Sequence, residues 1–309
     1  MSLCNAALQD PKPFLKWAGG KGQLISAIES ALPTSLFTKK NVTYIEPFIG
    51  SGAVLFWLLK QYPAIKNAVI NDVNEDLVKA YKAIKHEPEN LIKALQKIQT
   101  AYFKLSNEED RKSFFLEKRN LFNHRHLNQR DNTALLIFLN RTCFNGLYRV
   151  NSNNQFNVPF GKYTNPKICD AKTIMADSEV LQRVTILQGD YTETLKYASK
   201  NTFFYFDPPY KPISKTSSFN AYAKVAFDDA QQVRLKEFCD LLSSKGYQWL
   251  LSNSDPKNID PSDAFFDDLY ASGVNFIERV SARRTINSNA AKRGNVFEIL
   301  ISNYQRTTR

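Results

Sequence analysis

Short runs of apolar residues, each ending in Gly, Pro, Asn or an acidic residue, recur along this chain. They occupy residues 43–52, 68–72 and 202–210, and a run at 248–254 resembles them. Strand-like apolar character also returns at 184–188. Continuous apolar runs followed by helical segments are typical of buried parallel strands. The pattern therefore predicts an α/β sheet whose ligands bind at the carboxyl ends of its strands.

The middle of the chain has a different pattern. A helical pattern with charged faces continues to about residue 144, and residues 145–163, rich in Asn, Gly, Arg and aromatic residues, are predicted to form a β-hairpin. We therefore expect one sheet domain, made of residues 1–74 and 178–309, that is interrupted by a helical and hairpin insertion at 75–177.

Composition places limits on the function. The chain has 309 residues, of which 43% are hydrophobic, so it can bury a sizeable core. No apolar run reaches the roughly 18 residues of a membrane span, and the N-terminus does not resemble a signal peptide, so we expect a soluble, cytoplasmic protein without a membrane partner. The 41 Lys and Arg exceed the 30 Asp and Glu by eleven, which favours a polyanionic partner. The four scattered cysteines form no CxxC pair, which predicts reduced thiols and no metal site.

One strand end carries glycines. Glu46-Pro-Phe-Ile-Gly-Ser-Gly52 joins a predicted strand to a predicted helix, and glycines at such a turn let backbone amides approach a ligand closely. Asp72 ends the next strand and can accept hydrogen bonds from ribose hydroxyls. The motif is neither GxGxxG nor a P-loop. Nucleoside binding is the functional interpretation, and a strand-end turn with Asp72 or Asn74 as a helix cap is the structural one.

A second strand end carries two prolines. Asp207-Pro-Pro-Tyr210 follows Phe203-Phe-Tyr-Phe206. Consecutive prolines fix an extended backbone and remove two amide donors, so their carbonyls remain free to accept from a ligand amine. Asp207 adds an acceptor and Tyr210 a ring that can stack on a base. The motif predicts a site for the exocyclic amine of a nucleobase, and a rigid strand exit is the structural alternative.

Together these motifs resemble those of amino-group DNA methyltransferases, specifically the Dam-like N6-adenine group in its GATC-specific form. The resemblance covers nearly the whole chain, and the order of glycine motif, recognition insertion and Asp207-Pro-Pro-Tyr210 is that of this group. It also includes an N-terminal motif, Phe14-Leu-Lys-Trp-Ala-Gly-Gly-Lys21, and a C-terminal loop and strand, Arg283-Arg-Thr-Ile-Asn-Ser-Asn289 and Arg293-Gly-Asn-Val-Phe-Glu-Ile-Leu-Ile301. The fold that the resemblance implies is a Rossmann-like methyltransferase sheet with a helical and β-hairpin DNA-recognition insertion.

The resemblance implies S-adenosylmethionine as the cofactor. Lys21 would pair with its methionine carboxylate, Asp72 would hold its ribose, and Asp190 would contact its adenine amine; a solvated lysine and a turn residue are the alternatives for Lys21 and Asp190. The implied cofactor-binding residues are Trp17, Ala18, Gly19, Gly20, Lys21, Glu46, Pro47, Phe48, Gly50, Ser51, Gly52, Asp72, Asp190, Tyr191 and Asp207. The implied catalytic residues are Asp207, Pro208, Pro209 and Tyr210.

The hairpin resembles the part of the family that reads DNA. Arg149 would read a guanine, which is worth about 1–3 kcal/mol of discrimination. The family usually has Tyr where this chain has Phe144. The residues implied to bind DNA are Lys16, Arg141, Phe144, Asn145, Leu147, Arg149, Asn157, Pro159 and Tyr163. Candidates for phosphate contacts, with a solvated loop as the equal alternative, are Arg283, Arg284, Lys292 and Arg293. Without the resemblance, the hairpin would be interpreted as a surface hairpin with an arginine.

The resemblance thus predicts methyl transfer from S-adenosylmethionine to N6 of an adenine flipped out of double-stranded DNA, at GATC. A cytoplasmic monomer of bacterial or phage origin is expected. It would act in a restriction-modification system, beside an endonuclease for the same site, or as a solitary enzyme. The alternatives are an N4-cytosine or RNA amino methyltransferase and a catalytically inactive DNA-binding relative. A dinucleotide oxidoreductase is disfavoured because GxGxxG is missing.

Overall fold

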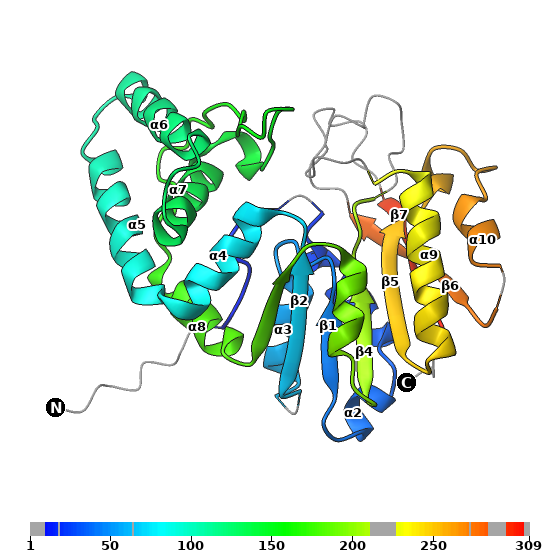
Figure 1. The fold of residues 1–309 in the computed structure, drawn as a ribbon. Helices are drawn as coiled ribbons and strands as arrows, with labels where there is room; N and C mark the ends of the chain where they lie inside the picture. The colour runs from blue at the N-terminus through cyan, green and yellow to red at the C-terminus, as the bar shows by residue number, and fades with distance from the viewer. Residues whose placement is uncertain are drawn as a thin grey trace.

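The computed structural model describes residues 10–17, 19–63, 65–210, 227–271, 273–283 and 295–305. Within these ranges the chain forms a sheet of seven strands in the order β3-β2-β1-β4-β5-β7-β6 (Figure 1). The strands are β1 (Thr43–Glu46), β2 (Asn67–Asp72), β3 (Val184–Gln188), β4 (Thr202–Phe206), β5 (Gln248–Ser254), β6 (Phe276–Arg283) and β7 (Asn295–Ser302). Five of them coincide with the predicted apolar runs, and the α/β fold class is confirmed.

Strand direction places the site. The pairs among β1 to β5 are parallel, whereas β7 is antiparallel to both β5 and β6. The strand order runs outward in opposite directions from the neighbours β1 and β4. Such a switch point leaves a crevice beyond the carboxyl ends of the two strands. The glycine motif follows β1 and Asp207 follows β4, so the two motifs meet at this crevice.

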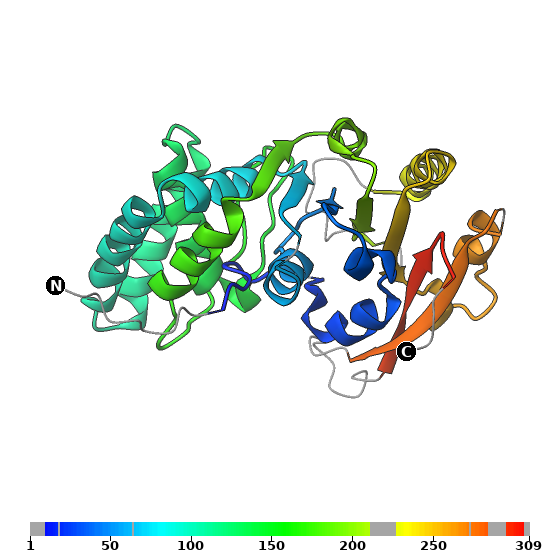
Figure 2. The same cartoon turned by 90° about the horizontal axis from the view of Figure 1, so that it is seen from below.

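Helices cover both faces of the sheet (Figure 2). Successive side chains of a strand point to opposite faces of the sheet, so they pack into two different apolar clusters. Tyr44 and Phe203 belong to one cluster, and Ile45 and Phe204 belong to the other. The first face is covered by η1 (Lys21–Gln23), α1 (Ile25–Ala31), α2 (Ser35–Thr38) and α3 (Ala53–Gln61). The second face is covered by η3 (Tyr191–Tyr197), α9 (Asp229–Ser244) and α10 (Phe265–Leu269), and η5 (Pro256–Asn258) follows β5.

The insertion lies beside the β3 edge of the sheet (Figure 1). Its helices are α4 (Glu75–His86), α5 (Pro88–Phe103), α6 (Glu108–Asn123), α7 (Gln129–Thr142), η2 (Phe144–Gly146) and α8 (Ala171–Leu181). Asn or Asp side chains cap the amino ends of four of them, namely Asn74, Asn107, Asn128 and Asp170. Helix α4 contacts β2 and β3 of the sheet as well as α5 and α7 of the insertion. The division into a sheet domain and a separate insertion at 75–177 stays a prediction.

Among the residues that the structure describes, no helix is long and apolar enough to cross a membrane.

Candidate active site

The glycine loop after β1 is shaped by close backbone contacts. Gly52, with φ of 72°, precedes α3, and a Cβ at this position would lie 2.5 Å from the Tyr81 hydroxyl oxygen. That hydroxyl donates to the Gly50 carbonyl at 3.0 Å. A side chain at Gly52 would therefore require a left-handed backbone and displace Tyr81. The glycine loop is therefore packed directly against Tyr81, and this packing depends on glycine at position 52.

Asp72, at the end of β2, faces this loop. Its Oδ2 accepts the Gly50 N–H at 3.2 Å, and its Oδ1 accepts the Asn74 N–H at 2.9 Å. Burial raises the pKa of Asp72 to about 6, although these amides oppose the rise. The residue thus stands where a ribose-binding carboxylate was predicted, while Asn74 caps α4, as the structural interpretation had it.

Asn71 is a functional candidate that sequence reasoning missed. Its side-chain Nδ2 donates to the Pro47 carbonyl at 3.1 Å and to the Gly189 carbonyl at 3.0 Å. Its backbone carbonyl accepts the Ile49 N–H at 3.0 Å. One buried amide therefore ties the glycine loop to the loop after β3. Its position directly before Asp72 was the only signal in the sequence.

The loop after β3 supplies an aromatic wall and an acidic residue. Tyr191 is buried and its ring centroid lies 5.1 Å from that of Phe48 in the glycine loop. Asp190 is exposed and accepts two hydrogen bonds from Arg234 of α9, at 2.7 and 3.0 Å. Burial raises the pKa of Asp190, but hydrogen bonds from Arg234 and Thr192 outweigh it and hold the pKa below its usual value. Arg234, a partner not predicted, keeps this carboxylate ionised and oriented.

The N-terminal motif reaches the catalytic motif through Lys21. Its side chain is buried, and its Nζ lies 2.6 Å from Asp207 Oδ1, 2.9 Å from the Gly19 carbonyl oxygen and 4.4 Å from the centroid of the Tyr210 ring. The prediction had paired Lys21 with a cofactor carboxylate. In the structure its carboxylate partner is Asp207, and Ala18 lies outside the described residues.

The Asp-Pro-Pro-Tyr motif presents free acceptors. Lys21 and the Ser252 hydroxyl both bind Asp207 at Oδ1, the latter at 3.2 Å. No hydrogen bond from a described residue reaches Asp207 Oδ2 or the Pro208 carbonyl. Burial raises the pKa of Asp207, and Lys21 and Ser252 oppose this rise. Two acceptors are thus left for a ligand amine.

Side chains from distant elements fix the rest of the motif. Gln232 of α9 is buried and donates from Nε2 to the Pro209 carbonyl at 3.3 Å, and Asn253 of β5 donates to its Oε1 at 3.3 Å. The Tyr210 hydroxyl donates to Glu298 of β7. None of these three side chains was predicted as a partner, because each is remote in the sequence from the residues it holds, and Glu298 was noted only as part of the C-terminal strand.

Other predicted cofactor residues support the loop from inside. Glu46 and Ser51 are buried, and Glu46 Oε2 accepts the Tyr44 hydroxyl at 2.8 Å. Burial raises the pKa of Glu46, and nearby Asp207 raises it further. These contacts lie inside the protein, so Glu46 supports the glycine loop from beneath.

An open pocket adjoins the N-terminal motif. Its cavity volume is about 390 Å³, and its wall includes Trp17, Gly20 and Ser51. The rest of the wall comes from Gly22, from α3, and from residues 10–13 and Leu15, and neither Asp72 nor Asp207 lines it. The pocket is therefore not the crevice at the strand ends.

The predicted hairpin is present and has two faces. Backbone bonds join its strands, from Phe144 N to the Pro159 carbonyl at 2.8 Å and from Asn157 N to the Arg149 carbonyl at 3.1 Å. Tyr148, Phe156 and Val158 are buried, whereas the exposed face carries Phe144, Asn145, Arg149 and Pro159, with Leu147 and Asn157 half-buried. Arg149 Nε donates to Asn157 Oδ1 at 2.7 Å. The structure thus gathers the predicted base-contacting residues on one face.

The N-terminal motif also joins the hairpin. Lys16 Nζ lies 4.9 Å from the centroid of the Tyr163 ring. Asn140, buried and not predicted, accepts the Lys16 N–H at 2.8 Å and donates at 2.8 Å to the carbonyls of Lys16 and Gly146. One amide side chain therefore ties Lys16, a predicted DNA-binding residue, to Gly146 at the start of the hairpin.

Some predicted DNA contacts are placed elsewhere. Arg141 is half-buried, and its guanidinium donates to the Phe14 carbonyl at 2.7 Å, so it holds the N-terminal segment. Of the candidate phosphate contacts, Arg284, Lys292 and Arg293 lie outside the described residues, and only the backbone of Arg283, at the end of β6, is described.

Comparison with known proteins gives concordant matches. Residues 17–286 match the model of a family described as D12 class N6 adenine-specific DNA methyltransferase. The chain is 46% identical to the Type II methyltransferase M.MjaIII of Methanocaldococcus jannaschii, over 95% of this chain and 99% of that protein. It is 38% identical to the Type II methyltransferase M1.LlaDCHI of Lactococcus lactis subsp. cremoris, over 98% and 99%. Identity to a DNA adenine methylase of Haemophilus influenzae is 32%, over 94% and 92%.

Proposed function

This chain belongs to the D12 class of N6 adenine-specific DNA methyltransferases, and on that premise we propose that it methylates adenine within GATC. Family membership makes it an adenine-specific DNA methyltransferase that acts on double-stranded DNA with S-adenosylmethionine as methyl donor. The N4-cytosine and RNA alternatives are not the chemistry of this family. The recognition sequence, the base flipping and the individual residue roles are our proposals.

The residues at the strand ends fit S-adenosylmethionine. Asp72, oriented by two backbone amides, would accept from the ribose hydroxyls. The rings of Phe48 and Tyr191 would flank the adenine of the cofactor. Asp190, held ionised by Arg234, would accept a hydrogen bond from the adenine amine. The cofactor, when bound, supplies an electrophilic methyl group on a sulfonium.

Catalysis would rest on positioning of the target amine. The adenine N6 lone pair is delocalised into the ring and is a poor nucleophile. Asp207 Oδ2 and the Pro208 carbonyl, free of hydrogen bonds from the described residues, would accept hydrogen bonds from the two N6–H groups and favour a tetrahedral nitrogen. This is orientation combined with electrostatic stabilisation. Tyr210, anchored by Glu298, would stack on the flipped base.

The exposed face of the hairpin carries the GATC proposal. Arg149 is exposed, and Asn157 orients its guanidinium: Nε donates to Asn157 Oδ1 at 2.7 Å and Nη2 donates to the Asn157 carbonyl at 3.4 Å. A guanidinium fork matches the O6 and N7 acceptors of guanine in the major groove. Phe144 and Pro159 on the same face would contact the disturbed base stack and the thymine methyl.

Two relatives support a modification role. The proteins with 46% and 38% identity are both named Type II methyltransferases, whereas identity to a DNA adenine methylase is 32%. We infer that this enzyme acts as a monomer and protects GATC sites from a cognate endonuclease. A neighbouring gene whose product cleaves unmethylated GATC, and is blocked by methylation with this enzyme, would be the expected finding.

One experiment tests the sequence preference. Duplexes that contain GATC or a single-base variant are incubated with the enzyme and labelled S-adenosylmethionine, and then digested with nucleases that distinguish methylated from unmethylated GATC. We expect label in N6-methyladenine, with protection at GATC only. Asp207→Ala should abolish transfer, while binding of DNA or of sinefungin, a non-reactive cofactor analogue, partly survives. Equal labelling of every variant would refute the GATC proposal.

A further inference from the structure

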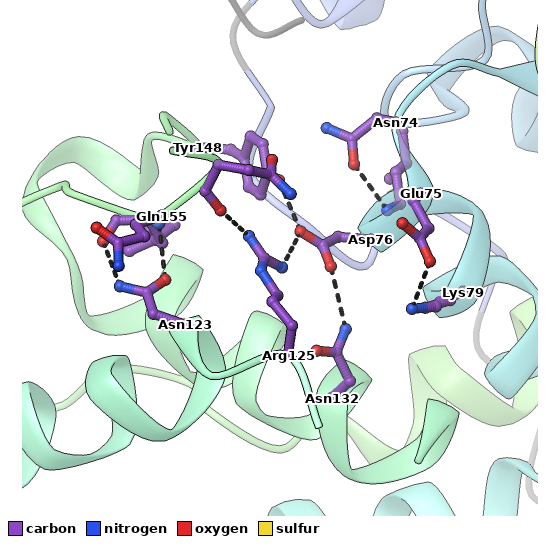
Figure 3. Close-up of polar contacts among 12 residues, drawn as sticks. Asn74, Glu75, Asp76, Lys79, Asn123, Arg125, Asn132, Tyr148 and Gln155 are labelled. Carbon is purple, nitrogen blue, oxygen red and sulfur yellow. Dashed lines mark hydrogen bonds and ion pairs between the residues drawn. The ribbon is translucent and has the colours of Figure 1, made fainter. Parts of the chain in front are cut away.

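A buried carboxylate at the start of the insertion binds three side chains from later in the insertion (Figure 3). Asp76 lies in the first turn of α4, shortly after Asp72, and is only 6% exposed. Its Oδ2 accepts the Tyr148 hydroxyl at 2.8 Å and Arg125 at 2.5 Å, and its Oδ1 accepts Asn132 at 3.3 Å. All three donors come from later parts of the insertion, so this carboxylate ties α7, the loop before it and the hairpin to the start of α4.

The same cluster holds the turn and the second strand of the hairpin. Arg125 also donates to the Asn154 carbonyl at 2.7 Å. Asn123 pairs with both backbone groups of Phe156, because its Oδ1 accepts the N–H at 2.7 Å and its Nδ2 donates to the carbonyl at 3.0 Å. The hairpin is therefore fixed at three backbone points, one by Arg125, which also binds Asp76, and two by Asn123.

Tyr148 belongs to both ends of this arrangement. Its ring stacks on Trp17 with centroids 5.2 Å apart and an interplanar angle of 24°. Trp17 in turn lies against the glycine loop, since a Cβ at Gly50 would lie 3.4 Å from its Cδ1. Tyr148 is 3% exposed, while its neighbour Arg149 is exposed, as expected for successive residues of an extended strand. Contacts thus run from the cofactor loop through two aromatic rings to Arg149.

We propose that Tyr148 is a positioning residue that couples the cofactor edge to sequence recognition. Its hydroxyl bond to Asp76 and its stack on Trp17 hold the hairpin in one place, so that Arg149 reads its base best when the glycine loop is ordered by cofactor. This inference rests on the proposed function, since it requires that the hairpin reads the target. Linkage is reciprocal: the factor by which cofactor raises the enzyme's affinity for cognate DNA equals the factor by which cognate DNA raises its affinity for cofactor.

The energetics favour this role for the hydroxyl. Burial, with the negative charge of Asp76 adding to it, raises the pKa of Tyr148, so the hydroxyl stays protonated and donates. A hydrogen bond to a charged group inside a protein is stronger than a neutral one. Removing it leaves Asp76 with Arg125 and Asn132, so the carboxylate is not stranded and the fold should survive.

The test compares two deletions of a buried hydroxyl. Tyr148→Phe removes the bond to Asp76 but keeps the ring. Tyr102→Phe is the matched control, because Tyr102 is fully buried in α5 and its hydroxyl has no hydrogen-bond partner among the described residues. For each enzyme, kcat and KM are measured on GATC and single-base-variant duplexes. Sinefungin affinity is measured with and without the GATC duplex.

For Tyr148→Phe, we expect the preference for GATC in kcat/KM to fall about tenfold, the equivalent of one charged hydrogen bond. The gain in sinefungin affinity caused by GATC duplex should shrink, while sinefungin affinity without DNA and kcat at saturating GATC duplex stay unchanged. Tyr102→Phe should match the wild type. Should Tyr148→Phe fail to fold, Asp76→Asn takes its place; it weakens the bonds to Tyr148 and to Arg125 together, and the same loss of preference and linkage is expected.

Several outcomes overturn the proposal. Undiminished preference and linkage in Tyr148→Phe would do so, as would an equal loss of activity on every duplex, which would mark a purely structural role. This inference alone would be overturned if the wild type prefers GATC, Arg149→Ala removes that preference, and Tyr148→Phe leaves it unchanged. A wild type without preference for GATC would overturn the proposed function and this inference together.

Discussion

At the scale of single residues, Asp72 shows how burial tunes a binding group. Its pKa is raised to about 6, and the ionised carboxylate is the better acceptor for ribose hydroxyls. The affinity for sinefungin should therefore be constant above that pKa and fall below it, by up to about tenfold per pH unit. Calorimetric titration across the pKa measures this.

Asp72→Asn is the control for other titrating groups. It should bind sinefungin more weakly but without the extra decline at low pH, because an amide does not titrate there. The ratio of wild-type to variant affinity is the decisive quantity. A ratio that is the same on both sides of the pKa would contradict the assignment of Asp72.

Asp177 is a buried carboxyl that has no part in the site. It is 0% exposed, its Oδ1 accepts the Lys12 N–H at 2.9 Å, and its Oδ2 has no partner among the described residues. Burial raises its pKa to about 8. In the unfolded chain the group ionises near pH 4, so between about pH 4 and 8 only the unfolded state has released the proton. Its contribution to stability is therefore lost as pH rises through this range.

Asp177→Asn should remove that loss. Relative to the wild type, the free energy of unfolding of the variant should rise with pH, by up to about 1.4 kcal/mol per pH unit, and level off above about pH 8. Urea unfolding at a series of pH values measures it. Glu117→Gln, a change to a carboxylate 66% exposed on α6, should show no such trend. A constant difference between Asp177→Asn and wild type would refute the prediction.

At the scale of elements, the junction of β1 and α3 depends on Gly52. In Gly52→Ala the residue must keep a φ of 72°, and its Cβ must displace the Tyr81 hydroxyl that now bonds to Gly50. The left-handed backbone alone costs about 1–2 kcal/mol. We expect at least this loss of stability together with weaker sinefungin binding, measured by thermal unfolding with and without the analogue.

Gly22→Ala is the matched control at this scale. A Cβ at Gly22 would meet no atom within 4 Å, and Gly22 has no positive φ, so the variant should be as stable as the wild type. Equal stability of the two variants would show that the loop relaxes around the methyl group, contrary to the tight junction described above.

At the scale of the whole molecule, the excess of eleven positive charges acts apart from sequence choice. Each phosphate neutralised lowers the slope of log K against log salt by about 0.9. Salt should therefore weaken binding to GATC and variant duplexes in parallel and preserve their ratio. Arg149→Ala should lower the ratio and change the slope little. Fluorescence anisotropy at several salt concentrations tests this, and a preference that disappears with rising salt would contradict it.

The sequence by itself determined the five parallel strands, the motifs and the family. Buried parallel strands are apolar throughout, and residues that bind a ligand follow them directly, so β1, β2 and β4 with Gly52, Asp72 and Asp207 could be identified from local order alone. The hairpin was equally predictable, because alternation and turn residues are local signals.

Only the tertiary structure decided which side chains support those motifs. Gln232 on Pro209, Arg234 on Asp190 and Tyr148 on Asp76 are contacts between segments far apart along the chain. No periodicity marks such residues, since each is placed by the packing of elements that meet only after folding. The order of a sequence specifies local conformation, whereas burial and hydrogen bonding between remote segments depend on the shape that the whole chain adopts.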